Sequence, residues 1–250
     1  MHPSQIERMA REEPDLRQLQ QQLQPIEATE NWPLLVELAT KALAECGENG
    51  AVEEAYLCYL AGKGLCELKN WIQAEPLLQR SVQLHPDFAF SFHLLGLCKA
   101  EAKEWQAAYS AASRSTELAP DFSHGWHAKG YAALELSNCK EAKNCFKRAI
   151  ELNNTISWFY YHSALAELRS AFGEGDAAAA EDHLLTVLML NPDHVECRQL
   201  LMQVLEAQRA GGDSVLLGTE IRERELRLEV HERLLAHFEH QNLQANGQAF

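Results

Sequence analysis

Positive charge is scarce in this chain of 250 residues. Lysine and arginine together number 22, against 36 aspartate and glutamate residues, so the formal net charge is −14. A surface this acidic repels phosphate groups, which argues against binding to nucleic acids and to anionic membranes. Apolar residues make up 46% of the chain and charged residues 23%, proportions typical of a chain that buries a core.

Long hydrophobic runs and paired cysteines are also missing. No apolar stretch approaches the roughly 18 residues that span a bilayer, and residues 1–5 do not resemble the start of a secretory signal. The seven cysteines are scattered, odd in number and include no Cys-x-x-Cys pair. This pattern predicts reduced thiols in a cytoplasmic protein, without a disulfide framework or a zinc site.

The usual sequence signatures of catalysis are absent as well. We find no glycine-rich phosphate loop, no Gly-x-Ser-x-Gly elbow and no His-Glu-x-x-His pair. We therefore expect a protein that is not an enzyme and that needs no cofactor.

What the sequence does contain is an internal repeat. Trp71 and Trp105 are 34 residues apart, as are Pro86 and Pro120. Small residues recur with the same period: Gly62, Gly96 and Gly130, and Ala74, Ala108 and Ala142. Such a period predicts helix-turn-helix repeats, in which small residues allow two helices to approach closely and a proline ends the second helix.

These residues resemble the tetratricopeptide repeat (TPR) family. Repeats 55–88, 89–122 and 123–156 match well, although Cys139 replaces the tryptophan and Asn154 the proline in the third. A fourth repeat, 157–194, has about four additional residues in its inter-helix turn. The resemblance implies an all-α, right-handed helix-turn-helix repeat solenoid of about four repeats.

The two ends of the chain are expected to cap this array. Residues 1–54 should form a polar segment and a degenerate repeat, with a first helix in 14–23 and a second helix after Trp32. Residues 195–250 should form capping helices and a loose tail. A helix reaching about residue 241 is expected to pack on the last repeat, but residues 216–238 could instead form a homodimer, since Ile221, Leu228 and Leu235 are seven residues apart.

The resemblance also implies that the first helix of each repeat lines a concave surface. Residues spaced i, i+3, i+7 on these helices form a strip rich in aromatic and histidine side chains. The predicted peptide-binding residues are Tyr56, Tyr59, Lys63, Phe90, His93, Leu97, His124, His127, Tyr131, Trp158, Tyr161 and His162. Some of them, especially Phe90 and Trp158, could instead pack between neighbouring helices.

These residues predict an adaptor that binds a peptide or a partner segment in an aromatic and histidine-rich groove. Of the Lys, Asn and Arg residues with which one TPR subset grips chaperone tails, only Lys63 is matched, so we expect no such clamp. Two alternatives remain open: a homodimeric assembly protein whose groove holds its own N-terminal segment, and a regulatory arm of a separate enzyme. No metal is expected at the histidines, but they could make binding sensitive to pH near 6–7.

Overall fold

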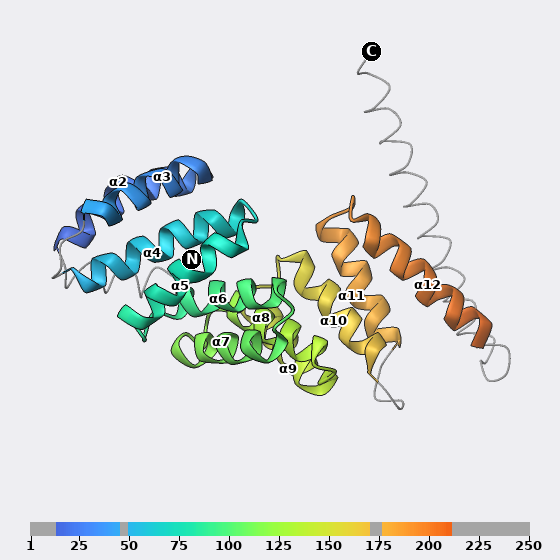
Figure 1. Cartoon of the computed structure of the whole chain (residues 1–250). Coiled ribbons are helices and arrows are strands. Elements are labelled where there is room, and N and C mark those ends of the chain that lie inside the picture. The colour runs from blue at the N-terminus through green and yellow to red at the C-terminus, as the bar shows by residue number, and fades with distance from the viewer. Residues whose placement is uncertain (1–13, 46–49, 171–176, 212–250) are drawn as a thin grey trace, which may run out of the picture. The chain divides into compact units, whose positions relative to one another are not determined.

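The computed structural model describes residues 14–45, 50–170 and 177–211, which are almost entirely helical and contain no strand. The chain divides into two compact bodies, unit 1 (Met1–Asn153) and unit 2 (Asn154–Phe250). Unit 1 contains α2 (Pro14–Ala28), α3 (Trp32–Glu45), α4 (Ala51–Glu67), α5 (Trp71–Leu84), α6 (Ala89–Glu101), α7 (Trp105–Leu118), α8 (Ser123–Glu135) and α9 (Cys139–Leu152) (Figure 1). Unit 2 contains α10 (Ser157–Arg169), α11 (Ala177–Leu190) and α12 (Val195–Gly211).

Consecutive helices pack in pairs: α2 with α3, α4 with α5, α6 with α7, α8 with α9, and α10 with α11. Within unit 1, each first helix also contacts the next one, α2 with α4, α4 with α6 and α6 with α8. The second helices contact mainly the first helices before and after them. The first helices therefore form the more closely packed row of unit 1, called its inner row below. This arrangement confirms the predicted all-α helix-turn-helix repeats.

Close packing within a pair depends on the repeated glycines. A Cβ atom at Gly62 would lie 2.7 Å from the side chain of Leu78, and one at Gly130 would lie 2.8 Å from the ring of Phe146. Leu78 and Phe146 are fully buried, and a Cβ at this distance would force the side chain or its helix to shift. The prediction that small residues let the paired helices approach each other is confirmed at Gly62 and Gly130, whereas a Cβ at Gly96 would lie 3.4 Å from its nearest neighbour, an ordinary contact.

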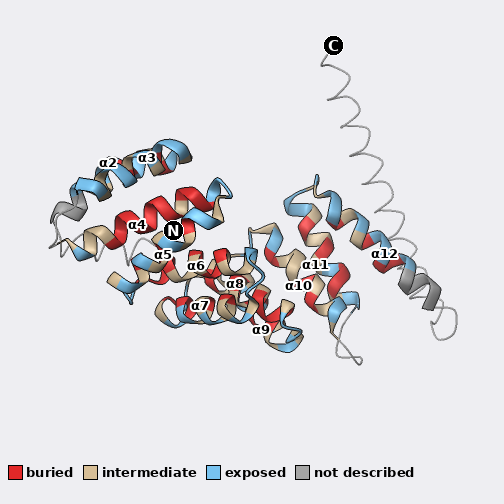
Figure 2. Cartoon of the chain, in the orientation of Figure 1, coloured by how far each residue is buried: buried red, intermediate tan, exposed pale blue. Residues whose placement is uncertain are grey.

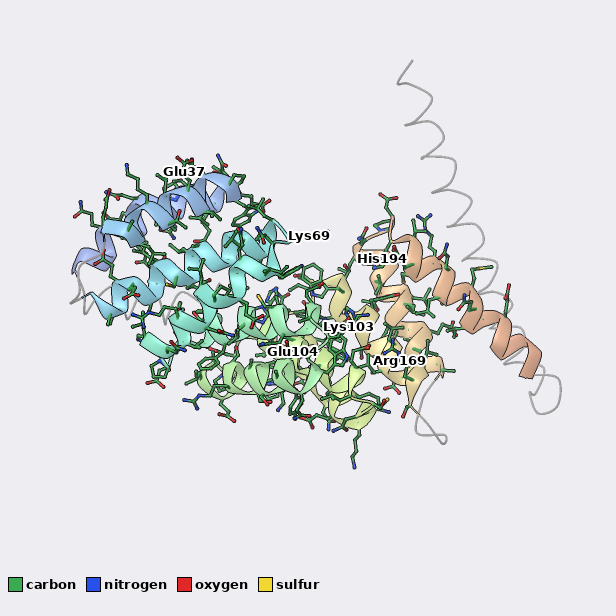
Figure 3. The ribbon with its side chains drawn as sticks, viewed as in Figure 1. Glu37, Lys69, Lys103, Glu104, Arg169 and His194 are labelled. Atoms are coloured by element: carbon green, nitrogen blue, oxygen red, sulfur yellow. The ribbon has the colours of Figure 1, made fainter. Side chains whose placement is uncertain are left out.

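The turns inside the repeats share one backbone conformation. Lys69, Lys103 and Ser137 have φ angles of 57°, 59° and 63°, in the left-handed region. In the first of these turns the Asn70 amide donates to the Leu65 carbonyl, which closes a left-handed helix cap. Lys69 and Lys103 are labelled in Figure 3. This conformation could not be predicted from the residues, because glycine usually occupies such a position.

Each unit has its own hydrophobic core (Figure 2). Leu35, Leu57 and Phe88 are fully buried in unit 1, and Leu184 and Leu201 are fully buried in unit 2. None of the helices in the described residues is long and apolar enough to cross a membrane.

The elements at both ends differ from the expected ranges. The first helix of the degenerate repeat, expected in 14–23, continues to Ala28 as α2 and includes Pro25. The first of the expected C-terminal capping helices is α12, which spans Val195–Gly211. The C-terminal helix, its proposed dimer contact at 216–238 and the tail lie outside the described residues.

Candidate functional site

Three of the predicted binding residues lie in the core. Tyr56, Tyr59 and Phe90 are each only 3% exposed. The ring of Tyr59 is 4.9 Å from that of Phe88 and 6.4 Å from that of Phe90, measured between centroids. The expectation that these three side chains line an open surface is wrong, because adjacent first helices pack together over these positions.

Helix α2 contributes to this burial. Leu23 of α2 belongs to the same core cluster as Tyr56 and Tyr59, and the side chain of Gln20 forms a hydrogen bond with Tyr56. Burial raises the pKa of both tyrosine hydroxyls well above its ordinary value, and the negative charge of Glu27 raises it further. The inner row is thus covered at α4 by the chain's own α2.

Lys63 is also engaged within unit 1. Its ammonium group donates to the carboxylate of Glu27 on α2 and lies 5.5 Å from the ring centroid of Trp32 on α3. The side chains of Lys63 and Glu27 are 16% and 7% exposed. Lys63 therefore connects α4 to both helices of the degenerate repeat.

Two phenylalanines that the sequence analysis did not select connect the aromatic residues of the inner row. Phe88 and Phe122 precede α6 and α8, and the ring of Phe122 lies 4.9 Å from Phe90 and 5.1 Å from His93. The sequence does contain a pattern that identifies both phenylalanines, because the tripeptide Pro-Asp-Phe ends at each of them with the 34-residue period.

The remaining predicted residues of unit 1 are half-buried on α6 and α8: His93, Leu97, His124, His127 and Tyr131. The ring of Tyr131 stands edge-on to Trp105 at 5.8 Å, and the ring of His127 lies 5.6 Å from Phe146. These contacts fix the side chains while leaving part of each exposed. This set of five residues is called the α6–α8 patch below.

Unit 2 holds the last three predicted residues, all on α10, which are called the α10 patch. Trp158 is 47% exposed, whereas Tyr161 and His162 are half-buried. The ring of Tyr161 lies 5.0 Å from that of His194, which precedes α12 and is labelled in Figure 3. Nδ1 of His162 lies 2.9 Å from the carbonyl oxygen of Trp158. Trp158 is the most exposed residue of the predicted strip.

The environment of His93 argues against one part of the pH hypothesis. Its Nδ1 atom is buried and has no hydrogen-bond partner among the described residues. Burial, with a smaller contribution from the charge of His124, lowers the pKa of His93 to about 3. Burial also lowers the pKa of His124. His93 is therefore neutral between pH 6 and 7 and cannot sense pH in that range.

We expect His93 to make the folded chain less stable in acid. In the unfolded chain its pKa is about 6.5, so acidification protonates the unfolded state while the folded state remains neutral. Above the pKa of His93 in the unfolded chain, the folded state keeps its full stability. Below it, the free energy of unfolding decreases as the pH falls toward the pKa of His93 in the folded chain, by about 2 kcal/mol at about pH 5. The free energy of unfolding, measured in urea at neutral and at acidic pH, should differ less between the two pH values for His93→Leu than for the wild type. Equal differences in the two proteins would contradict the assignment.

Within the described residues, no group of three or more His, Cys, Asp or Glu side chains is arranged to hold a metal ion. The histidines of the two patches instead contact aromatic rings and backbone groups. Their geometry offers apolar area and hydrogen bonds, which are the contacts that a protein or peptide segment requires.

The paired helices and their partly exposed aromatic residues define a helical repeat protein. Its fold is that of the TPR proteins. A MamA double mutant is similar with a TM-score of 0.56 and 13% identity, over 72% of this chain and 96% of that one. YrrB, described as a TPR protein with an unusual peptide-binding site, has a TM-score of 0.56 and 15% identity, over 82% and 98%.

A chain of the APC/C hetero-tetramer Cut9-Hcn1 also has a TM-score of 0.56, with 19% identity over 60% of this chain and 30% of that one. No family model and no curated protein matches the sequence. The resemblance read from the 34-residue period is thus confirmed by structure, at the level of the fold.

Proposed function

We propose that the chain is a non-catalytic adaptor that binds a segment of a partner protein through its α10 patch in unit 2, and that the α6–α8 patch of unit 1 offers a second, separate binding surface. The observation that carries this proposal is the exposure of Trp158, which is 47% exposed, whereas the other tryptophan, tyrosine and phenylalanine residues of the described ranges are buried or half-buried. Tryptophan and tyrosine contribute much contact area at low entropic cost, and they dominate the energetics of many interfaces.

The binding residues in this proposal are fewer than the sequence predicted. Tyr56, Tyr59 and Phe90 are buried and are assigned no direct contact with the partner. Lys63 is paired with Glu27 and is not assigned one either. Direct contacts are assigned to the half-buried residues of the α6–α8 patch and to Trp158, Tyr161 and His162.

The charge of the chain points to a partner segment rich in lysine and arginine. A net charge of −14 attracts basic segments and accelerates their association at low salt. Cationic side chains also bind well to the faces of tryptophan and tyrosine rings. We place this adaptor in the cytoplasm, which its scattered cysteines favour.

The test compares two exposed residues in different repeats, one on a first helix and one on a second helix. Trp158→Ala removes the exposed ring of the first helix α10, whereas Ile72→Ala removes a side chain that is 89% exposed on the second helix α5. Partners are captured from native lysate with the intact chain, and their affinity is then measured with both variants. We expect Trp158→Ala to weaken binding about 30-fold or more, as a hot-spot residue does, and Ile72→Ala to leave it unchanged.

Other outcomes would favour the alternatives. Partners retained by Trp158→Ala but lost by Ile72→Ala would move the binding site to the second helices and overturn the proposal. A dimeric mass in solution together with unchanged capture by Trp158→Ala would favour the assembly role through residues 216–238. Capture of an enzyme whose activity the chain changes would support the regulatory arm.

A further inference from the structure

Two cysteine side chains meet between neighbouring helices of the inner row. Cys66 lies in the last turn of α4 and Cys98 in the second half of α6, and their Sγ atoms are 3.7 Å apart. The two residues are only 6% and 1% exposed. They are 32 positions apart in the sequence, so the packing of one repeat on the next brings them together.

We propose that Cys66 and Cys98 form a reversible disulfide when the chain is exposed to hydrogen peroxide, which links α4 to α6. A disulfide has an S–S length of about 2.05 Å, so the two sulfurs must approach by roughly 1.7 Å. Cys66 precedes Glu67, the last residue of α4, so a small displacement of the last helical turn can supply this movement.

The contact between the thiols decides which sulfur reacts first. Either sulfur can donate in this contact; with the Cys66 thiol as donor, the hydrogen bond lowers the pKa of Cys98, and the same interaction, together with burial, raises the pKa of Cys66. Cys98 is therefore the thiol that loses its proton more readily, and a thiolate is the reactive form.

The reaction is balanced by peroxide alone. The Cys98 thiolate attacks one peroxide oxygen, the O–O bond breaks, and a sulfenic acid and hydroxide form. The hydroxide removes the proton of Cys66 to give water. The Cys66 thiolate then attacks the Cys98 sulfur, the S–O bond breaks, and the hydroxide that leaves is protonated to a second water. The two thiols together lose two electrons, and one hydrogen peroxide is reduced to two water molecules.

Other buried cysteines have oxygen neighbours instead. The sulfur of Cys145 lies 3.7 Å from a carboxylate oxygen of Glu141, and that of Cys197 lies 3.3 Å from the carbonyl oxygen of Leu184. Cys145 is 1% exposed, as is Cys98, and is therefore a control that matches its burial.

Peptide mapping of the full folded chain tests the proposal. After treatment with peroxide, remaining thiols are alkylated in denaturant and the chain is digested with trypsin without reduction. Cleavage after Lys63, Lys69, Arg80 and Lys99 places Cys66 in peptide 64–69 and Cys98 in peptide 81–99, each with a single cysteine. We expect these two peptides to be linked, with the two thiols lost in a one-to-one ratio and both restored by dithiothreitol.

Variants separate this bond from general oxidation. Cys98→Ala should slow the oxidation of Cys66 about ten-fold or more, because Cys66 then lacks its reacting partner, whereas Cys145→Ala should leave the linked peptides unchanged. Half-buried Cys139 reports that the oxidant has acted. The proposal is wrong if Cys139 is oxidised while Cys66 and Cys98 remain open to alkylation, or if either one links mainly to another cysteine.

Discussion

Replacing Phe88 with alanine will lower the free energy of unfolding of unit 1 by about 3–5 kcal/mol. Phe88 is fully buried, and its ring contacts Tyr59 at 4.9 Å and Phe90 at 5.6 Å. The side chain fills the space between α4 and α6, and alanine would leave a cavity there that the helices of the repeat cannot close. Urea unfolding followed by circular dichroism measures the loss.

Phe122 provides a matched control for this substitution. It occupies the same position one repeat later, 34 residues on, but it is only half-buried. Phe122→Ala should therefore cost less, about 1–2 kcal/mol, because part of its ring already contacts water. Equal losses at the two positions would show that exposure does not distinguish them, and would contradict the account of Phe88 as the centre of the core between α4 and α6.

The fold could be predicted from the sequence because its main determinants recur. Gly62 and Gly130 mark positions where a helix approaches its partner, and a repeat shows such positions several times in one chain. The left-handed turns at Lys69 and Lys103 were not predictable in the same way, because those side chains give no conformational signal. The closed packing of the repeats determines that backbone, not the propensity of lysine.

The candidate site could be predicted only in part. Helical spacing correctly grouped Tyr59 and Trp158 with the other residues on the first helices, but it could not give their exposure. Tyr59 is covered by neighbouring elements, whereas Trp158 remains 47% exposed. The depth to which adjacent first helices overlap depends on tertiary packing, and periodicity within one helix carries no information about it.

Glu27 was missed for a related reason. It pairs with Lys63 across 36 residues, and the pairing depends on which turn of α2 lies beside α4. The N-terminal repeat departs from the 34-residue spacing, since Trp32 and Trp71 are 39 residues apart. The 34-residue spacing that relates the repeats 55–88, 89–122 and 123–156 therefore could not place α2 against Lys63.

Replacing Lys63 with glutamate will weaken the attachment of α2 to the rest of unit 1. The substitution puts a second carboxylate beside Glu27 in a largely buried place and removes the cation over the ring of Trp32. Breaking a buried pair in this way leaves a charge without compensation, and we expect amide hydrogen exchange in α2 to accelerate about 10–100-fold. Pro25 favours local opening, because it removes one backbone donor from the last turn of α2.

The charge swap distinguishes loss of the ion pair from general damage. Glu27→Lys combined with Lys63→Glu restores an ion pair in the reverse orientation, and it should return most of the protection of α2 while the contact with Trp32 stays lost. Exchange in α8, which does not include either residue, should change little in any of these variants. If the double variant exchanges as fast as Lys63→Glu alone, the pair does not hold α2. If protection returns, the ion pair, together with the packing of Leu23, holds α2 over Tyr56 and Tyr59, and release of α2 would expose the part of the inner row that the folded chain keeps closed.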